Sequence, residues 1–61
     1  MKISEMKKLL KSIGCFKVKE GGNHEIWFSP KTGKRFPIGR HDAQELKNGT
    51  QESIMKAAGL K

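Results

Sequence analysis

The sequence predicts an α+β fold in which two helices cover one face of a three-stranded antiparallel sheet. Near both ends of the chain, apolar residues recur at spacings of three and four, which is typical of helices with one buried face. Between them, apolar and polar residues alternate, which is typical of half-buried strands. Two glycine-containing turns divide this middle part into three runs. The expected order is α-β-β-β-α, in a single domain over residues 1–61 because this length allows only one core.

The first helix is expected over residues 3–13. Ser4 is a suitable N-cap, because a serine hydroxyl can accept a hydrogen bond from a free backbone N–H of the first turn. Gly14 falls where a glycine in the left-handed conformation would end the helix. Lysines fill the outer face, and the apolar residues at helical spacing are Ile3, Met6, Leu9, Leu10 and Ile13.

Three strands are expected over residues 16–19, 24–29 and 34–38. The first two are separated by the glycine-containing turn that precedes His24. The second turn, residues 30–33, begins with proline and ends with glycine, which are the residues that preset such a corner. Pro37 cannot donate a ladder hydrogen bond, so it belongs at a strand end or an edge.

Either face of the second strand would place a large apolar side chain away from the helices. We expect Trp27 on the outer face, where it could stack on a base or dock a protein partner. The other residues then form a matching core set: Phe16, Val18, Ile26, Phe28, Phe36 and Ile38. A buried Trp27 remains the alternative.

The C-terminal third is expected to form two helical pieces. Asp42 and Glu45 have the spacing of a capping box, which would open a short helical turn that stops at residues 48–49. Thr50 is a suitable cap for a last helix that ends at Gly59. Its apolar residues are Ile54, Met55, Ala57 and Ala58.

The charge of the chain points to a polyanionic partner. Thirteen Lys and Arg residues against six Asp and Glu residues give a net charge of +7. Phosphate contacts to such a surface supply affinity without reading sequence, so nucleic acid is the expected partner. Lys34, Arg35 and Arg40 are candidate phosphate contacts, although each alone could be a solvated charge. A basic surface that serves only an acidic protein is a further alternative.

The small number of cysteines and histidines limits the kinds of site that the chain can form. The single cysteine, Cys15, cannot form an internal disulfide, which fits a reducing cytoplasm, and beside Phe16 it is expected to be a small core residue. Two histidines and one widely spaced cysteine do not make a zinc site, so no metal or cofactor is expected. No segment has the length or the apolar run of a signal peptide or membrane span, so the expected location is the cytoplasm.

The segment Gly21-Gly22-Asn23-His24 carries the most chemical information. Its glycines permit a tight bend and the close approach of a ligand. Histidine is the side chain whose ordinary pKa lies nearest neutrality, so a histidine at a strand mouth can exchange protons at working pH. A hairpin turn followed by a polar surface histidine is the simpler alternative.

These features resemble, in order and at this length, the HicA family of RNA-cleaving toxins from HicAB toxin–antitoxin systems. The opening helix ends at Gly14, the glycine turn leads to His24, and a hairpin leads to Pro37 and the basic pair Arg40-His41. The closing helix has the form Ile-x-Lys-x-x-Gly-Leu over residues 54–60, preceded by Gly49-Thr50. Asn23 stands where many relatives have serine, and Ile38 and Gly39 lie between Pro37 and the basic pair, where relatives tend to have a shorter spacing.

The resemblance implies a double-stranded-RNA-binding-domain-like fold, an mRNA interferase that halts translation, and a HicB-like antitoxin that covers the active site. The family's catalytic histidine falls on His24. RNA carries its own nucleophile, the 2′-hydroxyl, so a base, a cation and an acid are sufficient for cleavage without a metal. His24 is the expected base, or base and acid in turn, and the turn at Gly22 and Asn23 is expected to help hold the phosphate.

Two points stay open at the level of sequence. His41 could be a second acid, a phosphate contact or simply the residue before Asp42. A module of the same fold could also bind double-stranded RNA without cutting it, since such modules read shape through phosphate and 2′-hydroxyl contacts.

Overall fold

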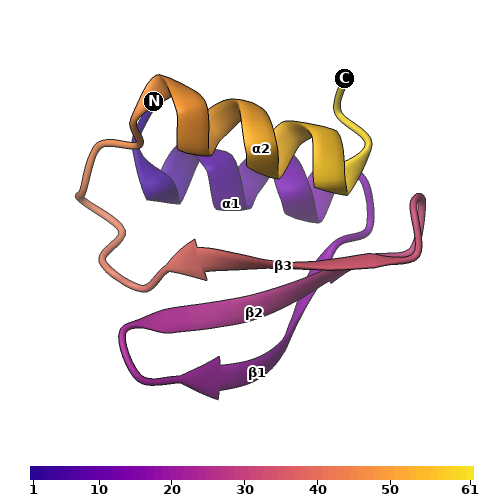
Figure 1. Cartoon of the computed structure of the whole chain (residues 1–61), viewed down its shortest axis with the longest axis horizontal. Coiled ribbons are helices and arrows are strands. Elements are labelled where there is room, and N and C mark those ends of the chain that lie inside the picture. The colour runs from indigo at the N-terminus through magenta and orange to yellow at the C-terminus, as the bar shows by residue number, and fades with distance from the viewer.

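The computed structural model describes residues 1–61 and confirms the order α-β-β-β-α. The elements are α1 (Ile3–Ser12), β1 (Phe16–Gly21), β2 (His24–Ser29), β3 (Lys34–Gly39) and α2 (Asn48–Ala58). The strands form one antiparallel sheet in the order β1-β2-β3. Figure 1 shows both helices on the same side of this sheet, as expected. No helix is both long enough and apolar enough to cross a membrane.

Glycines predicted the C-terminal ends of the helices correctly, whereas the predicted N-caps did not mark the N-terminal ends. Gly14 (φ 89°) and Gly59 (φ 87°) both adopt the left-handed conformation just beyond the last turn of α1 and α2. The predicted N-caps were wrong, because each helix begins before the residue expected to cap it. Lys2 precedes α1, where its backbone N–H donates to the Glu5 carboxylate at 3.0 Å, and Lys47 precedes α2.

The preference for an outward Trp27 was also wrong. Trp27 is 3% exposed and lies against the helices, opposite Phe36 of β3. Alternation then places Ile26 and Phe28 on the other face, where both are only half-buried. Of the expected core set, only Phe36 and Ile38 are buried. The core consists of Ile3, Met6, Leu10, Cys15, Trp27, Phe36, Ile38, Ile54 and Ala58.

Hydrogen bonds explain why β2 turns this face inward. Glu25, Trp27 and Ser29 all point toward the helices, and the polar groups among them find partners there. The Trp27 indole N–H donates to Glu25 Oε1 at 3.0 Å, and the Ser29 hydroxyl donates to the Ala58 carbonyl at 2.7 Å. Ser29 thus satisfies a free carbonyl at the end of α2, so burial of this face leaves no polar side chain without a partner.

A bulge in β1 determines which of its residues lie on the opposite face of the sheet. Phe16 pairs with Phe28 and Lys17 with Trp27, but the next pair is Lys19 with Ile26. The extra residue is Val18, which has no cross-strand partner and is 46% exposed. The bulge therefore brings Lys19, instead of Val18, opposite Ile26.

The segment 40–47 is not helical, so the predicted capping box was wrong. The Asp42 carboxylate accepts a hydrogen bond from Lys7 at 2.8 Å, and the Glu45 carboxylate accepts one from the N-terminal ammonium at 3.0 Å. Backbone N–H groups of Ile3 and Ser4 donate to carbonyls of this same segment. These contacts with the start of α1 replace the local helical turn.

Candidate active site at one end of the sheet

The glycine turn joins two antiparallel strands, as predicted, but its loop has only two residues because β1 extends to Gly21. Gly21 pairs with His24, which leaves Gly22 and Asn23 as the loop. Gly22 has a positive φ of 46°, and Asn23 does not. A positive φ at the first loop residue alone is the pattern of a type II′ turn, whose twist matches that of the two strands. The turn therefore fixes His24 as the first residue of β2.

His24 is exposed and stands between two glycines. Its cross-strand neighbours are Gly21 on β1 and Gly39 on β3, so no neighbouring side chain covers the imidazole from either strand. Arg40 follows β3, and its Nη1 donates a hydrogen bond to the Gly22 carbonyl at 2.8 Å. This bond ties the hairpin turn to the end of β3.

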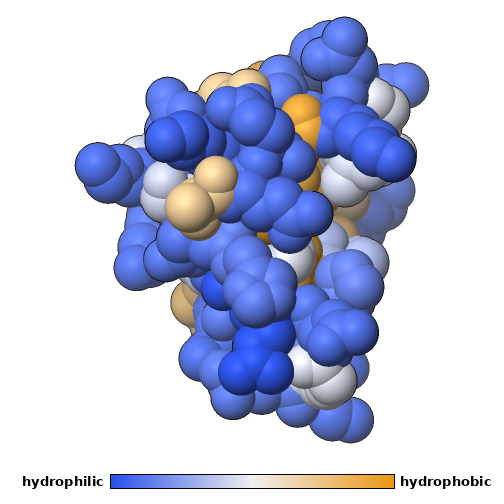
Figure 2. Space-filling model, turned by 90° about the vertical axis from the view of Figure 1, so that its left-hand side faces the viewer, coloured by the Kyte–Doolittle hydropathy of each residue, from blue (hydrophilic) through white to orange (hydrophobic).

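A pocket of about 320 Å³ lies beside His24, at the end of β3. Its walls include Gly39, Gln44 and Glu45 from the sheet end and the following segment, and Lys47 and Thr50 from the start of α2. This is the end of the molecule where the β1–β2 turn and residues 40–47 lie (Figure 1). Figure 2 views that end and shows a mostly hydrophilic surface with a few small apolar spots.

The start of α2 gives this pocket an anion-binding character. Lys47 makes no side-chain cap hydrogen bond, and the first turn contains no acidic residue. The first N–H groups of a helix have no partner within it, and its dipole is positive at this end. A phosphate oxygen could accept these hydrogen bonds while Lys47 supplies a full positive charge. The pocket thus places a histidine and a lysine beside the free N–H end of α2, with Glu45 also on its wall.

A polar network anchors β2 directly behind the histidine. Glu25 Oε1 lies 3.2 Å from Lys7 Nζ, which also lies 2.8 Å from Asp42 Oδ1. The hydrogen bond from Trp27, followed by that from Lys7, lowers the pKa of Glu25 although burial opposes this. Burial opposes the charge of Lys7, yet hydrogen bonds to Asp42 and Glu25 raise its pKa. The Lys7 hydrogen bond lowers the pKa of Asp42.

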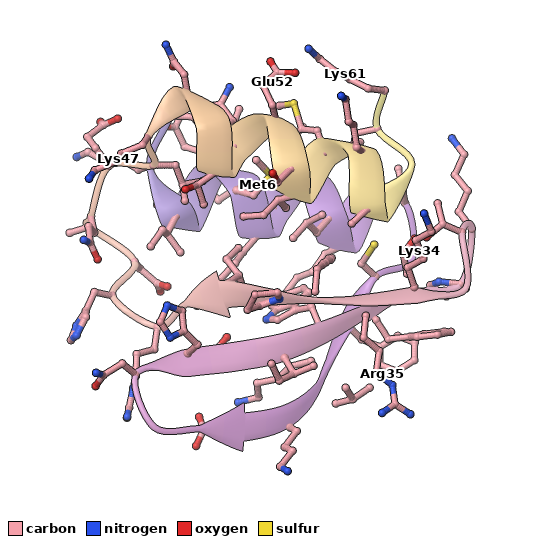
Figure 3. The ribbon with its side chains drawn as sticks, viewed as in Figure 1. Met6, Lys34, Arg35, Lys47, Glu52 and Lys61 are labelled. Atoms are coloured by element: carbon pink, nitrogen blue, oxygen red, sulfur yellow. The ribbon has the colours of Figure 1, made fainter.

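The structure brings together only some of the predicted site residues. Gly22, Asn23, His24 and Arg40 gather at one end of the sheet. Lys34 and Arg35 begin β3 at the opposite end, as Figure 3 shows. Buried Trp27 is unavailable for base stacking at this site.

His41 is exposed but does not line the pocket. Nowhere do three or more His, Cys, Asp or Glu side chains come close enough to hold a metal ion.

Sequence reasoning missed the contribution of Lys47 and Thr50 to the pocket. The run Lys47-Asn48-Gly49-Thr50 suggested a helix stop followed by a cap, whereas it forms the first turn of α2. A helix start with lysine and threonine but no acid was the available signal. Its proximity to His24 depends on the fold, because more than twenty residues separate the two segments.

The fold and the site define a small basic α+β domain that presents a histidine beside a pocket suited to an anion. The chain belongs to the HicA toxins of bacterial toxin–antitoxin systems, since the model of that family matches residues 3–60. This match confirms the resemblance, gives the chain a toxin role and implies an antitoxin partner. Comparison with curated proteins gave no match, and neither did comparison with solved structures.

Proposed function

We propose that this toxin is an mRNA-cleaving endoribonuclease and that His24 is its general base. The observation that carries the proposal is the shared pocket: exposed His24 lies on one wall and the free N–H end of α2 on another. Membership of a toxin family and the net charge of +7 support an RNA substrate.

The cleavage step needs only the RNA and this histidine. The neutral imidazole of His24 takes the proton of a ribose 2′-hydroxyl, and the 2′-oxygen attacks the adjacent phosphorus. The bond from phosphorus to the 5′-oxygen of the next nucleotide breaks, which leaves a 2′,3′-cyclic phosphate. The protonated imidazole, or a water, returns a proton to the leaving 5′-oxygen. Atoms and charge balance without an added co-reactant.

Positive groups around the pocket would stabilise the charge that develops on the phosphate. Lys47 and the first N–H groups of α2 lie on the pocket wall, whereas the turn at Gly22 and Asn23 precedes His24 outside the lining. Arg40 uses one N–H to hold the turn, which leaves other N–H groups of its guanidinium for a phosphate oxygen. A role for His41 as second acid or phosphate contact stays a prediction.

Cleavage of a labelled mRNA in the presence of EDTA tests this proposal. We expect the parent protein to cut and the His24→Ala variant to lose at least about a hundredfold in rate, the usual contribution of a general base. The variant should still retard RNA in a gel. His41→Ala tests the other histidine separately: a parental rate would leave His24 as the only histidine that cleavage needs, and a loss would support the predicted role of His41 as a second acid.

Two results would contradict the proposal. Cleavage by His24→Ala at the parental rate would remove His24 from the chemistry. Clear retardation of intact RNA by the parent protein would instead favour a non-catalytic double-stranded-RNA-binding module.

The antitoxin is expected to be a HicB-like protein that covers this end of the sheet. An antitoxin bound there would block both His24 and the pocket beside it. The expected observation is that the product of a neighbouring HicB-like gene co-purifies with the toxin and suppresses cleavage. A stable complex that still cleaves RNA would contradict this assignment.

A further inference from the structure

The sheet face turned away from the helices carries an exposed aromatic pair. We call it the open face; it consists of Phe16, Lys19, Ile26, Phe28, Arg35 and Pro37. Phe16 is 49% exposed, and its ring centroid lies 5.7 Å from that of Phe28 at an interplanar angle of 55°. Ile26 and Phe28 are half-buried, so apolar side chains from all three strands meet solvent here.

The charges of the open face have one sign. Lys19 lies opposite Ile26, and Arg35 lies opposite Phe28. Figure 3 shows Arg35 directed away from the helices. Neither cation forms an ion pair within the protein, and the face contains no acidic residue. The acidic Glu20 lies opposite Glu25 in the sheet, on the face toward the helices. Aromatic rings flanked only by cations match a partner with flat rings and negative charge.

The open face runs toward the end of the sheet where His24 lies. Alternation along β2 puts Phe28 and Ile26 on this face, and His24, two residues further along the strand, borders the pocket at the end of β3. Four residues of strand span about 13 Å, and four stacked nucleotides of one strand span about the same distance, since each rises about 3.4 Å. The flanking Gly21 and Gly39 keep the far end of this path free of cross-strand side chains.

We propose that the open face is a stacking platform for unpaired nucleotides, which guides a single strand of RNA toward His24. This inference rests on the proposed ribonuclease function and adds the class of substrate. Bases stack on exposed aromatic rings whatever their sequence, while Lys19 and Arg35 contact the backbone phosphates. A duplex cannot use the platform, because its bases are already stacked within the helix. Two copies of this face would bring their cations together without an acid to pair them.

Binding measurements on the full chain that carries His24→Ala test the platform, because this substitution should leave the RNA uncut. The probes are a short unstructured RNA and a duplex of the same length. We expect Phe16→Leu to weaken binding of the unstructured RNA about tenfold, since leucine is apolar but offers no ring. Duplex binding should change by less than about twofold. Phe16→Tyr should restore the affinity, because it restores a ring.

Two controls keep the result interpretable. Val18→Ala changes an equally exposed apolar residue of the same strand and should leave both affinities within about twofold. The fluorescence of buried Trp27, on the other face, reports whether each variant keeps its fold. Arg35→Gln tests the same face without touching the aromatic pair and should also weaken unstructured RNA preferentially.

Parental affinity of Phe16→Leu for the unstructured RNA would overturn the platform, as would equal losses for the duplex. Unchanged RNA binding with loss of the antitoxin complex would instead make the open face a protein interface. A cleavage assay on chains that retain His24 distinguishes failure of the platform from failure of the ribonuclease proposal. If Phe16→Leu leaves binding unchanged while His24 remains essential, the platform fails and the ribonuclease stands. If the parent never cleaves, the ribonuclease fails and the binding series still decides the platform.

Discussion

At the scale of single residues, His24 and Glu25 are neighbours in β2 with different surroundings. Glu25 points toward the helices, where Lys7 and Trp27 contact it at 3.2 Å and 3.0 Å. These contacts hold β2 in place at Glu25, and His24, the residue before it, stays exposed beside the pocket. The buried neighbour thus determines where the candidate base stands.

Replacement of Glu25 by alanine should destabilise the fold by about 1–3 kcal/mol, because it leaves the buried Trp27 N–H without an acceptor and Lys7 with Asp42 alone. Urea unfolding followed by Trp27 fluorescence measures this loss. Glu20→Ala is the matched control: its carboxylate is 62% exposed in a surface pair with Lys17, so less than about 0.5 kcal/mol is expected. Equal effects of the two substitutions would remove Glu25 from its anchoring role.

At the scale of elements, the hairpin turn positions His24 at the start of β2, and the start of α2 lines the same pocket. The turn depends on Gly22, whose φ of 46° is one that side chains disfavour. The start of α2 contains Gly49, which has helical geometry and open space where a Cβ would lie. The two glycines therefore differ in what a methyl group would do.

Gly22→Ala should destabilise the protein by about 1 kcal/mol, because alanine pays a steric penalty in the left-handed region. Gly49→Ala should stabilise it by about 0.5–1 kcal/mol, because alanine loses less conformational entropy within a helix. Thermal unfolding of both variants beside the parent gives the two signs. A stabilising Gly22→Ala would show that the turn does not hold the described geometry.

The elements themselves could be predicted because glycine and proline mark their ends. Gly14, Gly33 and Gly59 all adopt a positive φ at the predicted boundaries. The inward face of β2 could not be predicted, because both of its faces carry large apolar residues. Its choice depends on the contact of Glu25 with Lys7 of α1 and on the hydrogen bond that Ser29 donates to the Ala58 carbonyl of α2.

The segment 40–47 shows tertiary contacts that override a local signal. Asp42 and Glu45 have capping-box spacing, yet Lys7 and the N-terminal ammonium bind their carboxylates instead. Likewise, the sequence singled out His24, but it could not reveal that Lys47 and Thr50 line the same pocket. Neighbours brought together from distant segments require the fold.

At the scale of the whole molecule, the proposed binding of RNA should depend on the net charge of +7. Each phosphate contact to a single strand contributes a slope of about −0.7 to the plot of log affinity against log salt. Lys47→Gln should therefore make the slope shallower by about 0.7. Lys8→Gln, which changes an exposed lysine of α1 outside the pocket, should leave the slope unchanged. Equal slopes for parent and Lys47→Gln would exclude Lys47 as a phosphate contact.

Stability should fall in acid. The folded state lowers the pKa of Glu25 and Asp42 below their ordinary values of 4.5 and 3.8. Their contribution is complete above those values and is lost as the pH falls through the lowered ones. The raised pKa of Lys7 makes its contribution complete below 10.5, and this is lost only as the pH rises beyond that value. The urea midpoint of unfolding should fall as the pH is lowered, and it should fall less in Glu25→Gln. A Glu25→Gln profile identical to that of the parent would contradict the role of Glu25 in this loss.

The central claim is that His24 carries the toxic chemistry at this end of the sheet. Induced expression of the parent and of His24→Ala in bacteria, with growth and mRNA integrity followed together, tests it most directly. We expect the parent to arrest growth and degrade mRNA, and His24→Ala to accumulate as a folded protein without either effect. Growth arrest by a folded His24→Ala variant would contradict the account.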